Sequence, residues 1–485
     1  MIATGVMGSQ LPLTTYSEGG SFTGIVGHRT FLVLDIGTSS LKGAIMTDRG
    51  EVLSSVHHRI MGPSERAADF QAHRWTDALT RSVPHLVAGY ALDAVVFSGN
   101  GPTVVPVGHD GEPVGDPLLW LDSRSESIPG SRSFYLGKIA WFHRHSPQAD
   151  RVWKYLPFPE YLIYRLTGEA VATTPGEEFS PFVWSEEDRL RAGIPLEVLP
   201  SFVTIGSIAG YARPERGPEL GIPEGTPVIA AGSDFLMSLV GTNTLRPGET
   251  CDRAGTSEGI NHCSAVHIDR PGLRTLPHVI PGRYNVAGIL SSTGLLFEWF
   301  REISGQKNRD YGDMMLDILN VTDTADVPWF FPSVHRGAAW EFQRGMFIGL
   351  GAEHDSAALG RAVVLSIGFA VREAVDILRA SQCDVTRLNA CGGQAKNGLW
   401  TQMKADIVGV PIEVPAVADA ELTGDLCAGM VGIDAASSLE EAADQVVHMV
   451  HTYEPDPSKS ARYREQYERY RDRYQRFRQA LEECE

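Results

Sequence analysis

The sequence predicts an α/β protein with two large domains, and three observations support this. The chain has 485 residues, whereas a single hydrophobic core stops growing at roughly 250 to 300 residues. Hydrophobic residues make up 43% of the chain and charged residues 21%, which is the composition of a globular protein. Short apolar runs alternate with longer amphipathic stretches, as a sheet covered by helices requires.

The N-terminal half opens with a predicted strand, a tight turn and a second strand. An apolar run at 31–35 ends in an aspartate, a turn rich in Gly, Thr and Ser follows, and a second apolar run covers 44–46. We expect a helix near 75–89, then a buried strand at 94–97 that ends in Ser-Gly-Asn-Gly-Pro. Residues 1–30 lack a basic segment followed by a long apolar one, so we expect a mobile extension and no secretory signal.

The pattern continues through the middle and the end of the chain. The apolar run 228–231 ends in Gly-Ser-Asp, so Asp234 lies at the carboxyl end of a strand, where open α/β sheets bind ligands. A long helix is predicted over 356–380, and a strand at 387–391 leads through a Gly-Gly turn into another helix. After residue 455, aromatic residues recur at spacings of three and four, which predicts an amphipathic helix that packs on its domain.

We therefore divide the chain into four segments. They are a mobile extension at 1–30, an N-terminal domain at 31–262, a C-terminal domain at 263–455 and a terminal amphipathic helix at 456–485.

Charge and cysteine content exclude several classes of partner. The formal net charge of -18 argues against nucleic acid and acidic membranes as partners. The sequence nowhere approaches the roughly 18 consecutive apolar residues of a membrane helix, so we expect a soluble protein. Six cysteines show neither a CxxC pair nor zinc-ligand spacing, which predicts buried, reduced thiols in the cytoplasm.

Two turns have the composition of phosphate-binding turns. Asp35 ends a strand beside Gly37, Thr38 and Ser39; backbone N–H groups and hydroxyls in such a turn can bind phosphate oxygens, and the carboxylate can hold a metal ion through water. Taken alone, an ordinary hairpin turn explains these residues. The second turn, Gly255–Ser257, repeats Gly-Thr-Ser, and a repeated turn favours a functional reading.

A third glycine turn and one carboxylate complete the pattern. Gly392 and Gly393 lie between a strand and a helix, where backbone amides at a helix N-terminus could face a nucleotide. An αβ turn that uses glycines for close packing explains this turn equally well. Asp234 is a candidate general base, because phosphorylating an alcohol needs a carboxylate that accepts the hydroxyl proton.

These elements, in this order, resemble the FGGY family of carbohydrate kinases, and the xylulokinase-like members in particular. The resemblance covers almost the whole chain from Phe31 onward. It is carried by Asp35–Ser39, Leu119–Arg124 (similar to Trp-x-Asp-x-Arg), Tyr164–Gly168, Gly255–Ser257, Arg344–Gly349 and Gly392–Asp406. It implies the actin/Hsp70/sugar-kinase fold: two ribonuclease-H-like domains with an interdomain cleft.

The resemblance also implies ATP and Mg²⁺ as cofactors and a small sugar or polyol as substrate, and it leaves a homodimer open. Asp234 would be the general base, and Asp35 and Asp234 would position Mg²⁺. The N-terminal domain would bind the sugar and the C-terminal domain the nucleotide. The implied ATP contacts are Gly37, Thr38, Ser39, Lys42, Gly255, Thr256, Gly294, Gly392, Gly393 and Asn397.

Departures from the family pattern concern the sugar pocket. Xylulokinase-like members carry Gln-Met-His-Gly where this chain has Asn100 in Ser-Gly-Asn-Gly-Pro, so the histidine is missing. Phe235 follows the candidate base, where the family usually has a polar residue. Trp120 is a candidate wall for the sugar, because an aromatic face stacks on the C–H face of a carbohydrate.

Three hypotheses follow from these residues. The first is ATP-dependent phosphorylation of a sugar, ketose or polyol hydroxyl. The second is a kinase for an unusual sugar acid or deoxy sugar, and the third is a nucleotide-binding regulatory protein without efficient transfer. A nicotinamide dehydrogenase is disfavoured, because no GxGxxG follows the first strand, and a P-loop enzyme lacks its Walker motif.

Overall fold

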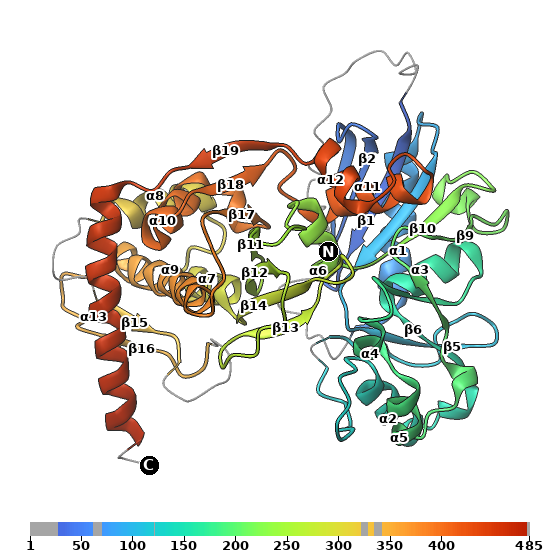
Figure 1. Cartoon of the computed structure of the whole chain (residues 1–485), viewed down its shortest axis with the longest axis horizontal. Helices are drawn as coiled ribbons and strands as arrows, with labels where there is room; N and C mark the ends of the chain where they lie inside the picture. The colour runs from blue at the N-terminus through green and yellow to red at the C-terminus, as the bar shows by residue number, and fades with distance from the viewer. Residues whose placement is uncertain (1–27, 62–69, 121, 322–327, 334–341, 483–485) are drawn as a thin grey trace, which may run out of the picture. The chain divides into compact units, whose positions relative to one another are not determined.

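The computed structural model describes residues 28–61, 70–120, 122–321, 328–333 and 342–482. The chain forms two compact units, which are Met1–Met237 with Asp425–Val446, and Ser238–Gly424 with Val447–Glu485 (Figure 1). Most of the predicted N-terminal extension, up to residue 27, lies outside the described residues.

The first unit is built on a six-stranded sheet of order β3-β2-β1-β4-β10-β9. Its strands are β1 (Thr30–Ile36), β2 (Ser40–Thr47), β3 (Val52–Arg59), β4 (Ala94–Gly99), β9 (Ile208–Tyr211) and β10 (Pro227–Ser233). Strands β1, β4 and β10 run parallel, and the other three pair antiparallel. The predicted strands 31–35, 94–97 and 228–231 are confirmed, and their carboxyl ends share one edge of the sheet.

Helices α1 (His73–Val87) and α3 (Phe158–Thr167) contribute to the core of the first unit. The fully buried Trp75 of α1 stacks on Phe158 of α3, with ring centroids 3.9 Å apart. Its indole N–H donates a hydrogen bond of 3.0 Å to the carbonyl of Gly37. The core therefore holds the turn that follows β1, and α1 begins two residues earlier than the predicted helix.

Helix α11 (Ala420–Gly432) starts in the second unit and ends in the first. The Ser98 hydroxyl donates a hydrogen bond of 2.9 Å to the carboxylate of Asp425. Gly429 packs so closely that an added Cβ would lie 2.9 Å from side-chain atoms of both Phe31 and Val96. Residues 425–446, which include α12 (Leu439–Val446), thus pack with the first unit.

The second unit is built on a seven-stranded sheet of order β13-β14-β12-β11-β17-β18-β19. Its strands are β11 (Thr250–Ala254), β12 (Glu258–Ser264), β13 (Arg274–Pro277), β14 (Tyr284–Leu290), β17 (Leu388–Cys391), β18 (Ile412–Pro415) and β19 (Met449–Tyr453). Strands β11, β12 and β14 form an antiparallel meander, β17 runs parallel to β11, and β18 runs parallel to β17. The first unit has the same arrangement, with β1, β2 and β3 as the meander and β4 and β10 as the parallel strands. This repeated α/β architecture is the predicted fold class.

The domain ranges given by the sequence differ from these compact units. The border between the first and the second unit lies between Met237 and Ser238, whereas the predicted border follows residue 262. The hairpin of β11 and β12 pairs within the second sheet, so its residues pack with the second unit. The predicted ranges stay a proposal for the functional halves of the chain.

The aromatic stripe near the C-terminus forms α13 (Pro457–Glu482), which packs on α9 (Ser356–Ala380) and α10 (Gly398–Val408) of the second unit (Figure 1). Tyr467 and Tyr470 lie against Phe369, with ring centroids 5.7 and 5.1 Å apart. The predicted amphipathic helix and its packing are confirmed.

The remaining elements are shorter or peripheral. They are β5 (Val104–Gly108), α2 (Leu136–His145), β6 (Val152–Pro157), β7 (Val171–Thr174), α4 (Ser180–Val183), α5 (Glu186–Ala192), β8 (Ser201–Thr204), α6 (Asp234–Gly241), α7 (Thr293–Ile303), α8 (Tyr311–Asn320), β15 (Trp329–Phe331) and β16 (Met346–Ile348).

Two further expectations concern thiols and membranes. Cys251, Cys263, Cys383, Cys391 and Cys427 are free and buried, and Cys484 lies outside the described residues. Within the described ranges, the helices are all too short or too polar to cross a membrane.

Candidate active site

Three predicted site residues of the first unit lie at the carboxyl ends of its three parallel strands. Asp35 is the second-last residue of β1, Asn100 follows β4, and Asp234 follows β10. The register pairs Asp35 with Ser98 and Ser233 with Gly99. Because parallel strands end at one edge, the sequence pattern and the sheet together place two carboxylates and one amide at the site where α/β sheets bind ligands.

The turn after β1 has the expected form. The N–H of Gly37 donates to the carbonyl of Ser40 at 2.8 Å, which closes the turn around Thr38 and Ser39. Lys42, directly across the hairpin from Asp35, places its ammonium 3.7 Å from the Asp35 carboxylate. The predicted phosphate turn thus combines hydroxyls, backbone amides and one cation beside a nearly buried acid.

Asp234 is the first residue of α6, so its carboxylate lies at the positive end of that helix. Its Oδ1 accepts a hydrogen bond of 2.6 Å from the backbone N–H of Phe235. This bond fixes the direction of the carboxylate. The backbone of Phe235 therefore orients the carboxylate of the candidate base, and this role does not depend on the Phe235 side chain.

The segment that follows Asn100 is hydrogen-bonded to Trp120, whose backbone N–H donates to the Thr103 hydroxyl at 3.1 Å. Asn100 is only 8% exposed, and in the described chain neither its side-chain oxygen nor its nitrogen has a hydrogen-bond partner. Trp120 is 38% exposed. The buried ammonium of Lys138 on α2 joins the two segments, because it donates to the carbonyls of Pro102 and Trp120 at 3.1 and 3.2 Å.

Sequence reasoning missed Glu160 of α3. The side chain is 2% exposed, and its Oε1 accepts a hydrogen bond of 3.0 Å from the backbone N–H of Thr173. Its Oε2 has no partner among the described residues. Burial raises the pKa of this carboxyl group, against the hydrogen bonds from Thr173. The sequence does carry one signal for it: Glu160 is the only acid in the otherwise mostly apolar first part of α3, at 158–163.

Tyr135 was also missed. Its hydroxyl lies 2.9 Å from the position that a Cβ of Gly101 would take, and Ser233 lies 3.4 Å from the same point. Burial raises the pKa of Tyr135, and the negative charges of Glu160 and Asp234 raise it further. The phenol therefore lies between the segment after β4 and the segment that carries Asp234.

The second unit brings its predicted residues together around the end of β11. The N–H of Gly255 donates to the carbonyl of Ser257 at 2.8 Å, and the carbonyl of Thr256 accepts from Leu295 at 3.2 Å. A Cβ on Gly294 would lie 2.1 Å from the carbonyl oxygen of Gly255. Only glycine permits this approach between the N-terminus of α7 and the Gly-Thr-Ser turn.

The Gly392–Gly393 turn joins the same cluster. Gly392 has φ +86°, and a Cβ there would lie 2.4 Å from the carbonyl oxygen of Ala254, so this position needs glycine. Within the described ranges, a Cβ on Gly393 would meet no atom within 4 Å. Asn397 caps α10, because its side-chain oxygen accepts from the N–H of Trp400 at 3.1 Å.

The residues of the first unit fit a magnesium ion in their chemistry. Asp35 and Asp234 lie at the carboxyl ends of β1 and β10, which flank β4 in the sheet. Mg²⁺ is usually held by one or two carboxylates, with waters and substrate phosphates completing its shell. In the part of the chain that the structure describes, no three His, Cys, Asp or Glu side chains gather as a metal site. Two carboxylates are a donor set that suits an ion whose other ligands are waters and substrate phosphates.

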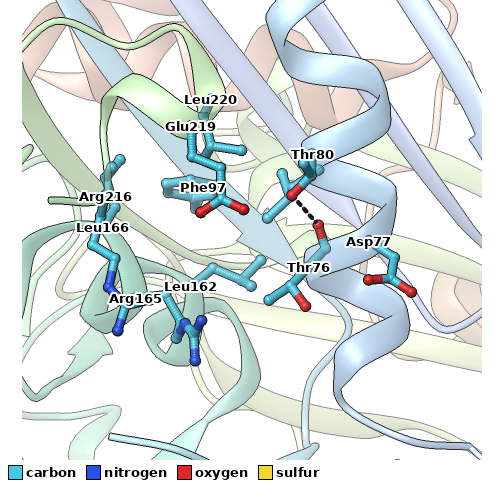
Figure 2. Close-up of a pocket in the computed structure, with 11 residues that line it drawn as sticks. Thr76, Asp77, Thr80, Phe97, Leu162, Arg165, Leu166, Arg216, Glu219 and Leu220 are labelled. Carbon is cyan, nitrogen blue, oxygen red and sulfur yellow. Dashed lines mark hydrogen bonds between the residues drawn. The ribbon is translucent and has the colours of Figure 1, made fainter.

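A separate cavity of about 150 Å³ lies between α1 and α3 (Figure 2). Thr76 and Asp77 of α1 line one side, and Arg165, Arg216 and Glu219 contribute its other charged groups. Two arginines and two carboxylates leave its formal charge balanced. None of the residues that the sequence predicted for the site lines this cavity, so it is distinct from the candidate active site.

Two family models match the chain. Residues 129–241 match the N-terminal domain of the FGGY family of carbohydrate kinases, and residues 253–433 match its C-terminal domain. Together these ranges cover more than half of the chain.

Individual relatives and solved structures agree with these matches. The chain is 26% identical to a xylulose kinase of Lactococcus lactis subsp. lactis over 475 residues, which covers 90% of this chain and 95% of that protein. It is 27% identical over 330 residues to an autoinducer-2 kinase of Escherichia coli, covering 63% of this chain and 62% of that protein. A gluconate kinase of Lactobacillus acidophilus has the same fold, with a TM-score of 0.79, 20% identity, and coverage of 95% of this chain and 100% of that one.

Proposed function

The chain belongs to the FGGY family of carbohydrate kinases and is a carbohydrate kinase, and we propose that it transfers the γ-phosphoryl group of ATP to a hydroxyl of a sugar, ketose or polyol. The observation that carries this proposal is the position of Asp35, Asn100 and Asp234 at one edge of the first sheet. This edge combines a candidate base with groups that can bind phosphate and hydroxyls.

In the first unit, Asp234 acts as the general base. Its carboxylate, oriented by the N–H of Phe235, accepts the proton of the acceptor hydroxyl as the oxygen attacks phosphorus. Thr38, Ser39 and Lys42 stabilise the negative charge of the phosphates. Asn100, Trp120 and Phe235 lie around the acceptor.

In the second unit, the Gly255–Ser257 turn, the Gly392–Gly393 turn and the N-terminus of α7 bind the nucleotide. Backbone amides at Gly255, Thr256 and Gly393 hold phosphate oxygens, because amides at turns and helix N-termini form anion sites. Gly294, Gly392 and Asn397 shape the adenosine side. Variants in each unit can test whether its own turns contribute to ATP binding.

Asp35 and Asp234 would hold Mg²⁺, which supplies charge neutralisation on the transferred phosphoryl group when bound. The Lys42 ammonium beside Asp35 then has two partners, the carboxylate and a phosphate. We further propose that the protein acts in the cytoplasm on a freely diffusing substrate, and that it needs neither nucleic acid nor a membrane.

The test is ADP release by the purified chain with Mg-ATP across pentuloses, hexuloses, polyols, aldoses, deoxy sugars and sugar acids. Asp234→Asn should lose transfer by about 10²- to 10⁴-fold, the usual contribution of a general base, with an unchanged melting temperature. Asp77→Asn, the same change in the separate cavity of Figure 2, is the matched control and should keep full activity.

The outcomes separate the hypotheses. Wild-type activity in Asp234→Asn would refute the role of this base. Tight ATP binding without acceptor-stimulated ADP release across the whole panel would favour a nucleotide-binding regulatory protein. Activity confined to sugar acids or deoxy sugars would favour the unusual-substrate kinase.

A further inference from the structure

Three polar side chains of the second unit meet in its interior, and we call Asp252, Glu258 and Lys404 the buried triad. Asp252 lies on β11, Glu258 begins β12, and Lys404 lies on α10. The Lys404 ammonium donates to the Asp252 carboxylate at 2.9 Å and also to the Glu258 carboxyl group. Each of the three side chains is at most 3% exposed, so salt and water screen these contacts little.

The buried triad holds the β11–β12 hairpin directly below its turn. Ala254 pairs with Glu258 across the hairpin, and Gly255–Ser257 forms the turn between them. Asp252 lies two residues before Ala254, and side chains two residues apart in a strand share a face. Asp252 and Glu258 therefore lie on the same face of the two strands, and one ammonium from α10 bridges them.

The helix that supplies Lys404 also follows the second glycine turn. Strand β17 runs parallel to β11 and leads into Gly392 and Gly393, and α10 comes next with Asn397 as its N-cap. The two turns are in direct contact, since a Cβ on Gly392 would lie 2.4 Å from the carbonyl oxygen of Ala254. The buried triad thus links the helix that follows one turn to the hairpin that carries the other.

Stability alone does not require polar side chains at this place. The neighbouring Ile260 and Ala405 belong to an apolar cluster, and replacing a buried ion pair by apolar side chains of similar volume is often neutral or stabilising. A charge-assisted hydrogen bond differs from apolar packing because it fixes both distance and direction. The buried triad is therefore suited to hold the hairpin and the helix in one register.

We propose that Asp252, Glu258 and Lys404 are positioning residues for nucleotide binding, which hold the Gly255–Ser257 turn at a fixed distance from the Gly392–Gly393 turn. The inference rests on the proposed kinase function, in which both turns bind ATP, and it adds residues that do not touch the nucleotide. An anion site in a turn needs several N–H groups aimed at one ligand. A shift of the hairpin relative to α10 takes some of them out of hydrogen-bond range, so ATP affinity falls although the turn keeps its own sequence.

Glu258→Leu is the first test, because it removes the bond between Lys404 and β12 and leaves the ammonium paired with Asp252. We expect calorimetric titration to show a Kd for Mg-ATP raised on the order of 10- to 100-fold, as the loss of one hydrogen bond to a charged group predicts. In the kinase assay, KM for ATP should rise and KM for the acceptor should stay unchanged. Glu258→Gln keeps an oxygen that accepts from Lys404 and should restore the wild-type Kd.

The triple variant Asp252→Val, Glu258→Leu and Lys404→Met separates positioning from stability. It replaces the whole buried triad by apolar side chains, so its melting temperature should equal or exceed that of wild type. The Kd for Mg-ATP should nevertheless rise as it does in Glu258→Leu. A purely structural role would leave ATP affinity unchanged in this variant. If the triple variant does not fold, the comparison of Glu258→Leu with Glu258→Gln decides alone.

Thr250→Val is the matched control. Thr250 pairs with His262 at the other end of the same hairpin, and their side chains form a buried hydrogen bond of 2.9 Å. Its loss should lower the melting temperature and leave the Kd for Mg-ATP unchanged. A Kd raised as much as in Glu258→Leu would show that any weakening of the hairpin impairs binding, and would overturn the inference.

Two further outcomes separate this inference from the proposed function. Equal Kd values for Mg-ATP in wild type and Glu258→Leu would overturn the inference alone, because the wild-type chain would still bind ATP. Absence of ATP binding in the wild type would refute the nucleotide site of the proposed function, and this inference with it.

Discussion

The ammonium of Lys404 on α10 lies 2.9 Å from the carboxylate of Asp252 on β11, and it also hydrogen-bonds Glu258 on β12. All three side chains are buried. Glu258 directly follows the Gly-Thr-Ser turn that ends at Ser257, so this buried triad connects the turn to the helix behind it. The second unit thus ties a candidate phosphate-binding turn to its core through charge as well as through apolar contacts.

Lys404→Met should destabilise the protein by about 3 to 5 kcal/mol, because it leaves two buried carboxyl groups without their cation. The free energy of unfolding in urea measures this. Lys396→Met is the matched control: Lys396 on the surface pairs with Asp419 at 2.8 Å, and its side chain is 51% exposed. An exposed pair contributes less than about 1 kcal/mol. Equal losses in both variants would contradict the role assigned to burial.

Glu258→Gln should change how stability depends on pH. Burial, and then the charge of Asp252, raise the pKa of Glu258 from 4.5 to about 8 in the folded chain. The folded state therefore holds a proton that the unfolded state releases above pH 4.5. The stabilising contribution is fully present below pH 4.5 and is lost as the pH rises to about 8.

The variant lacks this titration, so its stability relative to wild type should increase by a few kcal/mol between pH 5 and pH 8, at roughly 1.4 kcal/mol per pH unit at most. Urea denaturation at several pH values measures the difference. A variant whose stability differs from wild type by the same amount at every pH would show that Glu258 ionises normally in the fold.

The strand ends of both units could be predicted from the sequence, because apolar runs that stop at Gly, Ser or Asp mark them locally. Asp35, Asp234 and the three glycine turns were found in this way. The triad could not be found, because Lys404 lies 146 residues from Glu258 in the chain. A lysine in a helix is normally solvated, and only the packed sheet shows that this one is buried.

Tyr135 and Glu160 escaped prediction for the same reason. Each lies in a segment whose local pattern only indicates helix or loop, and tertiary packing alone brings both to the end of β10. The return of residues 425–446 to the first unit was also not predictable. The apolar run at 426–431 would be buried in either unit, so its composition does not say which sheet it covers.

Tyr470→Ala should destabilise the second unit by about 3 to 5 kcal/mol, as truncation of a large buried aromatic side chain does. Tyr470 on α13 packs against Phe331 and Phe369, with ring centroids 4.8 and 5.1 Å apart. Gln475→Ala, an exposed change on the same helix, should cost less than about 0.5 kcal/mol. Thermal unfolding measures both, and a negligible shift for Tyr470→Ala would refute the anchoring role of this aromatic stripe.

Gly392 and Gly393 offer a test of nucleotide binding that separates folding from function. Gly393 has φ -61°, which alanine adopts readily, and a Cβ there meets no described atom within 4 Å. If that open space holds the nucleotide, Gly393→Ala should keep the melting temperature and weaken ATP binding on the order of 10-fold, equivalent to about 1.4 kcal/mol.

Gly392→Ala should instead lower the melting temperature, because its φ of +86° and the carbonyl of Ala254 at 2.4 Å exclude a side chain. Calorimetric titration with ATP and thermal unfolding of both variants distinguish the two effects. Normal ATP affinity in Gly393→Ala would mean that the nucleotide does not approach this turn, and the candidate site of the second unit would then have to lie away from α10.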